Sequence, residues 1–439
     1  MTIRYSTVGI VGTGAMGRGI AQIAAQAGST VQLFDLNPEA CRQAHAAIAA
    51  QWDKLQDKGR IDAATADAYK TRLQTAASLG DLHNCDLVVE AAVERLDIKQ
   101  SLFAQLEDIV RPDAVLVTNT SSLSVTAIAA GLKRPAQFAG YHFFNPVPLM
   151  KVVEVIAGLK TDTAVCAGLT EYARQMGHTP VQAQDTPGFI VNHAGRAYGT
   201  EALRIVSEGV TDFATIDRIL KDQVGFKLGP FELMDLTGLD VSHPVMESIY
   251  RQYYDEARYR PSVITAQRLA GGVLGKKTGE GFYQYVEGVQ QHTAEPAAPD
   301  VAEMPPVWVS PGAAARSRLR APSPARRQDI RAAAHALMAR DGKAVSVIRD
   351  SGGFVTQRVV ASIVNIASDI CQQGVCSPAD LEKAVTLGLG YPMGPLAMGD
   401  RYGPTNVLEV LFNMQTVYGD QRYRPSPWLR RRGAIGLSL

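Results

Sequence analysis

The sequence predicts an α/β domain followed by two copies of an all-α helical domain. Up to residue 186, short apolar runs alternate with helical stretches, which is typical of a mostly parallel sheet covered by helices on both faces. From Thr186 onward the pattern changes to long helical periodicities, with Pro and Gly at the joints. The pattern of this helical part recurs at the end of the chain, which indicates a duplication.

The first part of the chain begins as strand, turn, helix and strand. Residues 8–11 are an apolar run, residues 16–27 have helical periodicity, and residues 31–35 are a second apolar run that ends on an acid. Three further segments continue the alternation as strand, helix and strand: residues 87–90, 98–110 and 114–118. We therefore expect one α/β domain over residues 1–186.

A glycine-rich turn, GTGAMG, joins the first predicted strand to the first helix. Its spacing predicts a Rossmann domain that binds a dinucleotide. Gly12 permits the tight turn, Gly14 lets the pyrophosphate approach the backbone, and Gly17 packs the helix against the strand. Ala15 and Met16 begin the helix, whose N-terminus then faces the phosphates. A turn that serves packing alone is the alternative.

An acidic residue, Asp35, ends the second predicted strand, about 20 residues beyond the glycine turn. A carboxylate at this place accepts a hydrogen bond from a ribose 2′-hydroxyl and repels a 2′-phosphate. We therefore expect NAD rather than NADP as the cofactor. FAD competes for the same motif, but the residues described next count against it.

Two further apolar runs, residues 141–146 and 151–156, are separated by a proline-containing turn. If both are strands, they can bring His142 and Glu154 together. A carboxylate behind a histidine fixes its tautomer and stabilises its cationic form, as a general base in hydride transfer requires. The spacing alone leaves a purely structural histidine as the alternative.

An internal repeat relates two segments in the second half of the chain. Residues 185–192 (DTPGFIVN) recur, with substitutions, as residues 350–357 (DSGGFVTQ). The same spacing superposes three further pairs and, after the loss of one residue, a last one: Gly209 and Gly374, Gly229 and Gly394, Asp235 and Asp400, Pro261 and Pro425. We expect helical domains at residues 187–286 and 345–439, joined by a linker at residues 287–344.

The second helical copy lacks the residues that would make it catalytic. Gln357 stands at the position equivalent to Asn192, and neither a glycine motif nor a histidine–glutamate pair precedes it. We expect the first copy to bind substrate and the second to cover apolar surface. Residues 346–350 match residues 181–185, so the linker could retain a residual α/β segment.

The composition excludes several classes of protein. Acidic and basic residues nearly cancel at a net charge of +1, and no broad basic field indicates nucleic acid as a partner. The N-terminus lacks a signal-peptide pattern and no apolar run reaches bilayer length, so we expect a cytoplasmic chain without a membrane segment. The five cysteines contain no CxxC pair, which favours reduced thiols, and we expect no metal.

Six motifs together resemble one known family. They are residues 12–17, 89–94, 119–122, 142–146, 185–192 and 276–283. In these motifs the sequence resembles the L-3-hydroxyacyl-CoA dehydrogenases, in particular the bacterial 3-hydroxybutyryl-CoA and 3-hydroxyadipyl-CoA type, over residues 1–286. The resemblance extends in weaker form to the C-terminus, because the longer members of this type have the duplicated layout.

The resemblance implies reversible, NAD-dependent oxidation of an L-3-hydroxyacyl-CoA to the 3-oxoacyl-CoA. It implies that His142 is the catalytic base and that Glu154 orients it. Ser121 and Asn192 would bind the substrate at its 3-oxygen and thioester. Further family positions contact the cofactor: Glu94, Lys99, Asn119, Asn145 and Lys277. The family also associates the chain with fatty-acid β-oxidation and phenylacetate degradation.

The resemblance also implies lysines on the CoA side of the substrate. Lys58 and Lys99 fall where the family contacts CoA. Gln51 stands where some members have a CoA-binding serine, which puts that contact in doubt. For Lys54 and Lys58, a solvated helix face is an equally good explanation.

Two other functions remain open from the sequence. A related Rossmann dehydrogenase of a free hydroxy acid or sugar acid would share the glycines and Asp35 without needing CoA-binding lysines. The other is a non-catalytic NAD-binding or structural protein, against which the complete set of Ser121, His142, Glu154 and Asn192 argues. In family members with one helical domain these domains pair across a dimer, so we expect a homo-oligomer, such as a dimer, with acyl-CoA as substrate.

Overall fold

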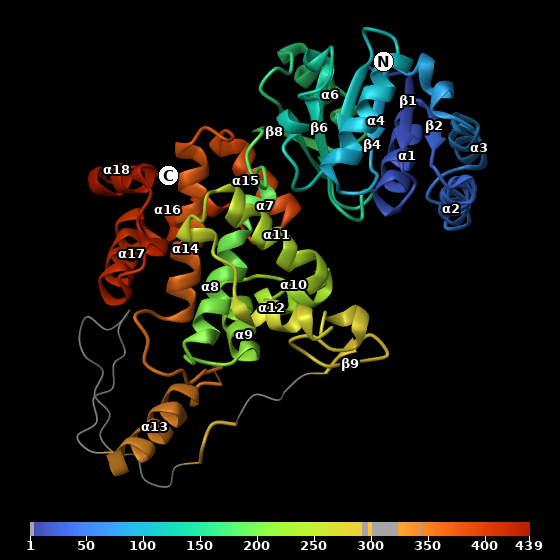
Figure 1. Cartoon of the computed structure of the whole chain (residues 1–439). Coiled ribbons are helices and arrows are strands. Elements are labelled where there is room, and N and C mark those ends of the chain that lie inside the picture. The colour runs from blue at the N-terminus through green and yellow to red at the C-terminus, as the bar shows by residue number, and fades with distance from the viewer. Residues whose placement is uncertain (1–3, 292–296, 301–323, 343) are drawn as a thin grey trace.

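The computed structural model describes residues 4–291, 297–300, 324–342 and 344–439. An N-terminal α/β domain lies beside a helical part that contains most of the remaining chain (Figure 1). This confirms the predicted order of an α/β domain followed by helices. Much of the predicted linker, including residues 301–323, lies outside the described residues.

Eight strands form the sheet of the α/β domain, in the order β3-β2-β1-β4-β5-β6-β7-β8. They are β1 (Thr7–Val11), β2 (Thr30–Phe34), β3 (Leu73–Thr75), β4 (Leu87–Glu90), β5 (Val115–Thr118), β6 (Phe138–Phe143), β7 (Val152–Ala157) and β8 (Thr179–Gln184). Neighbouring strands are parallel, except that β7 runs antiparallel to β6. The first six strands follow the order of a Rossmann sheet, in which ligands bind at the carboxyl ends of β1 and β4.

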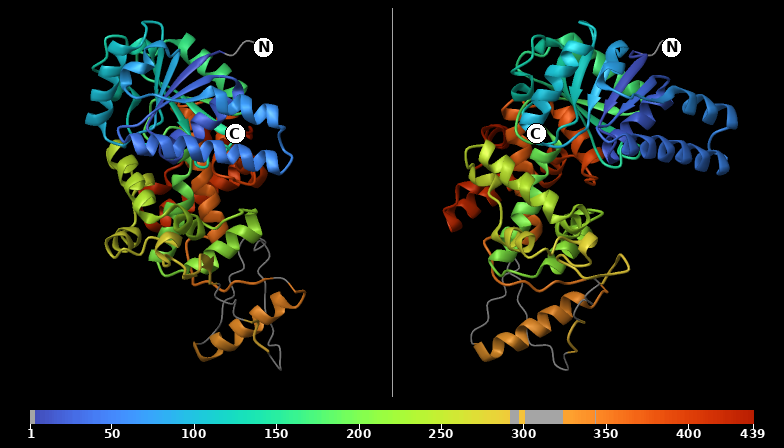
Figure 2. Two further views of the ribbon diagram at one scale, coloured as in Figure 1. Left: turned by 90° about the vertical axis from the view of Figure 1, so that its right-hand side faces the viewer. Right: turned by 45° about the vertical axis from the view of Figure 1, so that its right-hand side comes forward.

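Helices cover both faces of this sheet (Figure 2). They are α1 (Ala15–Ala27), α2 (Pro38–Asp57), α3 (Ala63–Arg72), α4 (Leu96–Ile109), α5 (Val125–Ala129) and α6 (Thr163–Gln175), with 3-10 turns at Leu79–Asn84 and Pro135–Gln137. Apolar side chains of α1, α2 and α6 pack on one face, and those of α4 and α5 pack on the other. Because both faces are covered, β4 and β5 are buried along their whole length.

Two series of helices form the helical part. The first series is α7 (Val191–Ala194), α8 (Arg196–Ser207), α9 (Phe213–Val224), α10 (Pro230–Thr237), α11 (Leu239–Gln252) and α12 (Val263–Ala270), with 3-10 turns at Ala257–Tyr259 and Lys276–Thr278 and a hairpin of β9 (Tyr285–Val286) and β10 (Val289–Gln290). The second series is α13 (Pro324–Ala339), α14 (Val355–Gln372), α15 (Pro378–Gly388), α16 (Pro395–Tyr402), α17 (Pro404–Tyr418) and α18 (Pro427–Ile435), with a 3-10 turn at Gln421–Tyr423.

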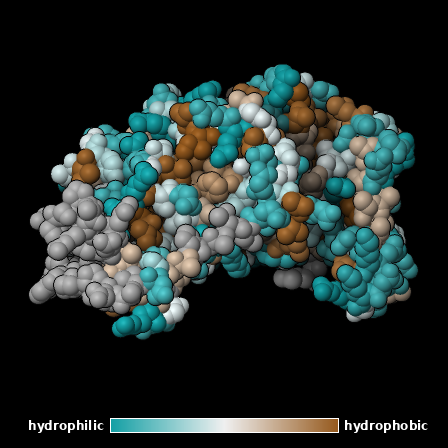
Figure 3. Space-filling model, turned by 90° about the horizontal axis from the view of Figure 1, so that it is seen from below, coloured by the Kyte–Doolittle hydropathy of each residue, from teal (hydrophilic) through white to brown (hydrophobic). Residues whose placement is uncertain are grey.

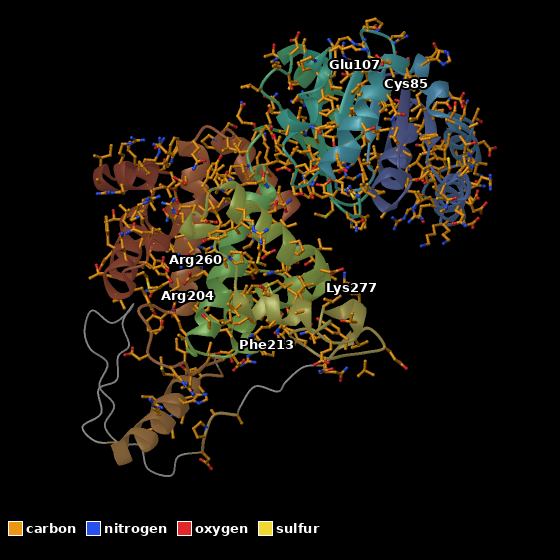
Figure 4. The ribbon with its side chains drawn as sticks, viewed as in Figure 1. Cys85, Glu107, Arg204, Phe213, Arg260 and Lys277 are labelled. Atoms are coloured by element: carbon orange, nitrogen blue, oxygen red, sulfur yellow. The ribbon has the colours of Figure 1, made fainter. Side chains whose placement is uncertain are left out.

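The two series pack together and also against the sheet. Helices α8 and α14 lie side by side, and α15 lies against β7, β8 and α7. Figure 4 labels Arg204 and Arg260 near the border between the two series. One apolar cluster runs from the α4–α5 face of the sheet through both series. The second series therefore shares a hydrophobic core with the α/β domain as well as with the first series.

Residues 346–350, where we expected residual α/β structure, form no strand in the described structure. Their counterparts in β8 are held by a continuous ladder to β7. Arg349 instead donates one backbone hydrogen bond, to the carbonyl oxygen of Val210 beyond α8. One bond to the end of a helix does not make a ladder, so the segment stays irregular.

The described residues contain no helix that is long and apolar enough to cross a membrane. Seen from below, the surface shows separate hydrophobic patches among hydrophilic residues (Figure 3). All five cysteines are unpaired. Within the described ranges, no group of three or more His, Cys, Asp or Glu residues could hold a metal ion.

Candidate active site

The antiparallel pairing of β6 and β7 puts a histidine opposite a glutamate. His142 and Glu154 are direct partners in the register of these strands, and His142 Nδ1 lies 2.6 Å from Glu154 Oε2. Both side chains are buried, with 6% and 0% exposure. The other carboxylate oxygen, Oε1, accepts the backbone N–H groups of Ile190 and Val191, each at 2.9 Å. Every oxygen of this carboxylate is thus engaged.

These contacts decide where the imidazole carries its proton. An ionised carboxylate can only accept hydrogen bonds, so Nδ1 of His142 carries a proton and donates a hydrogen bond to Glu154. The Nε2 atom then has a lone pair with which it can accept a proton. The ring also contacts the rings of Phe144 and Phe189, at centroid distances of 4.5 and 5.9 Å. The pair can therefore work as a base of fixed orientation.

Two polar residues meet next to this pair, one from each side of the domain boundary. Asn192 is the second residue of α7, whose first residue, Val191, is held by Glu154. Its amide Nδ2 donates to the carbonyl oxygen of Ser121, at 3.3 Å, on the loop after β5. These contacts link Asn192 to Ser121 and, through the neighbouring Val191, to the His142–Glu154 pair. The roles expected for these four residues stay predictions.

Glu94 holds the loop that carries Ser121. Its Oε1 atom accepts hydrogen bonds from Thr120 Oγ1 at 2.6 Å, Ser121 N at 2.9 Å and Ser122 N at 3.1 Å. Burial acts to raise the pKa of Glu94, but the hydrogen bond from Thr120 and the charge of Lys99 hold the pKa below its usual value. An ionised Glu94 therefore orients this loop.

Lys99 lies deeper than the resemblance implied. Its side chain is 1% exposed, and Nζ lies 2.5 Å from Glu90 Oε1 and 3.3 Å from Glu94 Oε2. Glu90, the last residue of β4, also accepts from Thr118 Oγ1 at 2.6 Å. A buried ammonium group requires such partners. Two carboxylates therefore hold the ammonium group of Lys99, which acts on the site through Glu94. The expected contact between Lys99 and CoA stays a prediction.

The glycine turn after β1 leaves room at the start of α1. Gly12 has a φ of +96°, and a Cβ atom there would lie 2.6 Å from the carbonyl oxygen of Ala91. A Cβ atom at Gly14 would meet open space instead. Because α1 begins directly after Gly14, its first N–H groups face that space. The residues present therefore fit the phosphates of a dinucleotide.

Other residues around this turn are equally suited to a dinucleotide. Ala15 and Met16 form the first turn of α1, and a Cβ atom at Gly17 would overlap the carbonyl oxygen of Gly12. Asp35 Oδ2 accepts from the backbone N–H and the hydroxyl of Thr13, at 2.8 and 2.9 Å. Burial acts to raise the pKa of Asp35, but hydrogen bonds from Asn37 and Thr13 lower it. An ionised acid thus lies beside the glycine turn.

Two asparagines lie at the ends of neighbouring strands. Asn119 follows β5, and its Oδ1 atom accepts the backbone N–H of Phe143 at 2.8 Å, directly beside His142. Asn145 follows β6 and is exposed. Both therefore lie at the edge of the sheet where the expected cofactor contacts belong.

Two expected lysines lie apart from this group. Lys277 lies in the helical part (Figure 4). Its ammonium group pairs there with Asp240. Lys58 follows the last turn of α2 and is exposed, as are Lys54 and Gln51. Among the described contacts, none joins Lys277 or Lys58 to His142. The sequence could not place these lysines, because their distance from the site depends on how separate elements pack.

The sequence analysis missed the backbone groups that hold Glu154. Gly188 and Phe189 both have positive φ, at 79° and 48°, which turns the chain sharply before α7. This turn directs the N–H groups of Ile190 and Val191 to Glu154 Oε1. The Pro-Gly-Phe sequence before α7 is the local signal that could have indicated it.

The fold and the site together define an NAD-dependent dehydrogenase of the Rossmann type. Residues 7–186 match the family model described as 3-hydroxyacyl-CoA dehydrogenase, NAD binding domain. Residues 188–285 and 353–437 match that described as 3-hydroxyacyl-CoA dehydrogenase, C-terminal domain. The chain belongs to the 3-hydroxyacyl-CoA dehydrogenase family.

Similar proteins fall into two lengths. The chain is 38% identical to a 3-hydroxyadipyl-CoA dehydrogenase of Escherichia coli (strain K12), over 99% of both chains. A crystal structure of 3-hydroxybutyryl-CoA dehydrogenase from Escherichia coli K12 has a TM-score of 0.90 and 36% identity, and covers 98% of this chain and 99% of that one. A probable 3-hydroxybutyryl-CoA dehydrogenase of Deinococcus radiodurans is 42% identical, over 63% of this chain and 99% of its own length.

Proposed function

We propose that this chain oxidises an L-3-hydroxyacyl-CoA to the 3-oxoacyl-CoA with NAD. The observation that carries the proposal is the buried His142–Glu154 pair, which meets Ser121 and Asn192 in a domain that also has a dinucleotide turn. The names of the relatives support the substrate, since they specify 3-hydroxyadipyl-CoA and 3-hydroxybutyryl-CoA. A dehydrogenase of free hydroxy acids or sugar acids is not favoured, because these relatives are named for CoA thioesters.

In the proposed reaction, the C3–H bond of the substrate breaks and both its electrons leave with the hydrogen, while the C3–O bond becomes a carbonyl. NAD, when bound, supplies the acceptor for this hydride. The hydroxyl proton passes to Nε2 of His142, and Glu154 stabilises the imidazolium that forms. The Ser121 hydroxyl and the Asn192 amide hold the 3-oxygen and the thioester, which orients C3.

Other residues have supporting roles in this proposal. Asp35 accepts the ribose 2′-hydroxyl, which favours NAD over NADP. Glu94 holds the loop after β5, Asn119 holds the end of β6, and Asn145 contacts the cofactor beyond the end of β6. The exposed Lys58 is available to the phosphates of CoA.

We also propose that the helical part is a duplicated domain. The divisions are an α/β domain at residues 1–186, a first helical copy at 187–286, a linker at 287–344 and a second, non-catalytic copy at 345–439. The order of the elements supports this, because α9 to α12 are followed by α15 to α18 with closely similar spacing. The Deinococcus relative aligns over 99% of its own length with 63% of this chain, which is the length expected of a protein with one helical copy.

Reciprocal contacts give further support to the duplication. The backbone N–H of Gln184 donates to the carbonyl oxygen of Val375, and the N–H of Arg349 donates to that of Val210. The two donors, Gln184 and Arg349, are separated in the sequence by the repeat spacing, and so are the two acceptors, Val210 and Val375. Such exchange is expected of two copies related by an approximate twofold axis. Since α14 covers α8 within the chain, we propose that a homo-oligomer would use another surface.

The test of the proposed function is the variant His142→Ala, assayed with 3-hydroxybutyryl-CoA and NAD. Turnover should fall by ~10² or more, because the proton acceptor is lost, while NADH fluorescence titration still shows binding. The matched control is His83→Ala, which removes an exposed histidine and should keep full activity. Near-normal turnover of His142→Ala would show that another group takes the proton.

A further inference from the structure

Two consecutive carbonyl groups of the loop after β5 bind to the helical part. The carbonyl oxygen of Ser121 accepts from Asn192 Nδ2 at 3.3 Å. That of Ser122 accepts from Gln252 Nε2 at 3.1 Å. Asn192 lies in α7, and Gln252 is the last residue of α11. Two peptide groups of the α/β domain are therefore held by side-chain amides from two different helices.

The residues that follow these two amides are also joined to each other. His193 Nδ1 lies 3.2 Å from the hydroxyl of Tyr253, and His193 Nε2 lies 2.7 Å from the hydroxyl of Tyr259. His193 is completely buried, and burial lowers its pKa to about 3, so the imidazole is neutral. A neutral imidazole has one donor and one acceptor nitrogen, which suits two hydroxyl groups. His193 thus connects α7 to the end of α11.

These contacts close a ring of hydrogen bonds through three pairs of adjacent residues. The pairs are Ser121 and Ser122, Asn192 and His193, and Gln252 and Tyr253. Each pair is joined to the other two by one hydrogen bond. The bonds in such a network support one another, because no pair can turn away without breaking a bond to another. The ring therefore fixes the loop relative to α7 more firmly than a single bond would.

Part of the loop is left unpacked by a cavity of about 480 Å³, whose lining includes Ser122, Leu123 and Gln252. Where the cavity lies, no side chains pack on the loop, so its position there depends on hydrogen bonds. Glu94 holds the backbone N–H groups of Ser121 and Ser122, at 2.9 and 3.1 Å. The ring holds the carbonyl groups of the same two residues. Both polar groups of each peptide are thus fixed from opposite parts of the molecule.

We propose that Gln252 and His193 are positioning residues for Ser121. Through the ring they hold the loop against α7, so that the Ser121 hydroxyl and the Asn192 amide meet the substrate in one geometry. Asn192 can serve both purposes, because one N–H of its amide donates to the carbonyl oxygen of Ser121 and leaves the other for the substrate. This inference rests on the proposed function, which assigns the 3-oxygen and the thioester to Ser121 and Asn192.

The effect on rate should be larger than the strength of one hydrogen bond suggests. A misplacement of about 1 Å at the reacting groups can cost about a hundredfold in rate. A bond that fixes the loop therefore acts mainly on kcat, whereas a bond that held the substrate equally in both states would act on KM.

The first test is Gln252→Ala, assayed with 3-hydroxybutyryl-CoA and NAD. Gln252 is exposed, so the variant should fold. We expect kcat to fall about five- to twentyfold, with KM and the Kd for NADH within about twofold of the wild-type values. Gln252→Glu has the same length but no N–H donor, and should lose at least as much. An unchanged kcat in both variants would overturn the proposal.

The second test asks whether the bonds act as one ring. Tyr253→Phe removes the hydroxyl that binds His193 and should lower kcat about three- to tenfold. The double variant Gln252→Ala/Tyr253→Phe should be at most about twofold slower than Gln252→Ala, because the ring is already open. Losses that multiply in the double variant would show two independent contacts, and the ring would be wrong.

Arg251→Ala is the matched control. Arg251 lines the same cavity, but its guanidinium group pairs with Glu247 of its own helix. It should keep kcat within about twofold of the wild-type value; a loss equal to that of Gln252→Ala would assign the effect to the cavity wall and overturn the proposal.

Hydrogen exchange of residues 119–124, measured by mass spectrometry on the full chain, tests the ring without any substrate. Exchange should be faster in Gln252→Ala than in the wild-type chain and unchanged in Arg251→Ala, because only the first variant frees the loop. Equal exchange in Gln252→Ala and the wild-type chain would contradict the ring. If the wild-type chain oxidises no 3-hydroxyacyl-CoA, the proposed function fails, and hydrogen exchange still decides whether the ring holds the loop.

Discussion

The two helical segments, residues 187–286 and 345–439, have the same backbone plan and different chemistry. Gly209 and Gly374 both end a helix with positive φ, at 65° and 67°. At the start of α10 and α16, the backbone N–H groups are held by an acid from the preceding helix, Asp217 in one segment and Glu382 in the other. The two segments thus share the glycines and the acids at helix starts, which determine the path of the backbone.

The polar side chains at equivalent positions differ. Asn192 faces Ser121 across the domain boundary, whereas Gln357 accepts the N–H of Phe354 and so serves the start of its own helix. His193 is enclosed by tyrosine hydroxyls, but its counterpart Arg358 pairs with carboxylates of the first segment. The comparison teaches that two segments with the same backbone plan can carry different polar contacts at equivalent positions.

The largest effect should follow deletion of residues 345–439. Helix α15 lies against β7, the strand that carries Glu154, and the second segment belongs to the same apolar cluster as the sheet. Removing it exposes that surface, so we expect loss of soluble monomer, or a fall in Tm of more than about 10 °C. Size-exclusion chromatography and thermal unfolding measure this. A soluble monomer with the original Tm and activity would show that the segments are independent.

A smaller and more local effect separates the two equivalent amides. Asn192→Ala should lower kcat/KM by about a hundredfold, since it removes a donor next to the reacting atoms. Gln357→Ala should leave kcat/KM unchanged and cost about 1 kcal/mol of unfolding free energy or less, because it removes one bond at a helix start. Steady-state kinetics and urea unfolding of the two variants check this. Similar losses of kcat/KM would mean that both segments contact substrate.

The smallest expected effect concerns acid stability. Burial lowers the pKa of His193 to about 3, so the unfolded chain binds a proton between pH 6.5 and pH 3 that the folded chain does not. Stability attributable to this residue is present above pH 6.5 and is lost as the pH falls, by at most about 1.4 kcal/mol per pH unit. His193→Asn should reduce the slope of unfolding free energy against pH from 6.5 to 5. An unchanged slope would contradict a neutral, buried imidazole.

Local signals in the sequence were sufficient for the elements and the central pair. The strand at residues 87–90 and the helix at 16–27 agree with β4 and α1 to within a residue. The pairing of His142 with Glu154 could be predicted from the sequence, because a short turn between two strands restricts their register. These features depend on neighbours in the chain, and the sequence displays such neighbours directly.

Contacts between distant segments were decided by tertiary packing alone. Nothing near Lys99 in the chain shows that it is buried, because its burial requires α4 to lie across the end of β4. The position of Lys277 likewise depends on how whole helices pack. Backbone preferences and apolar periodicity depend on residues that are close in the sequence, so the sequence shows them. Burial and charge pairing depend on surfaces of distant segments, which meet only when the chain folds.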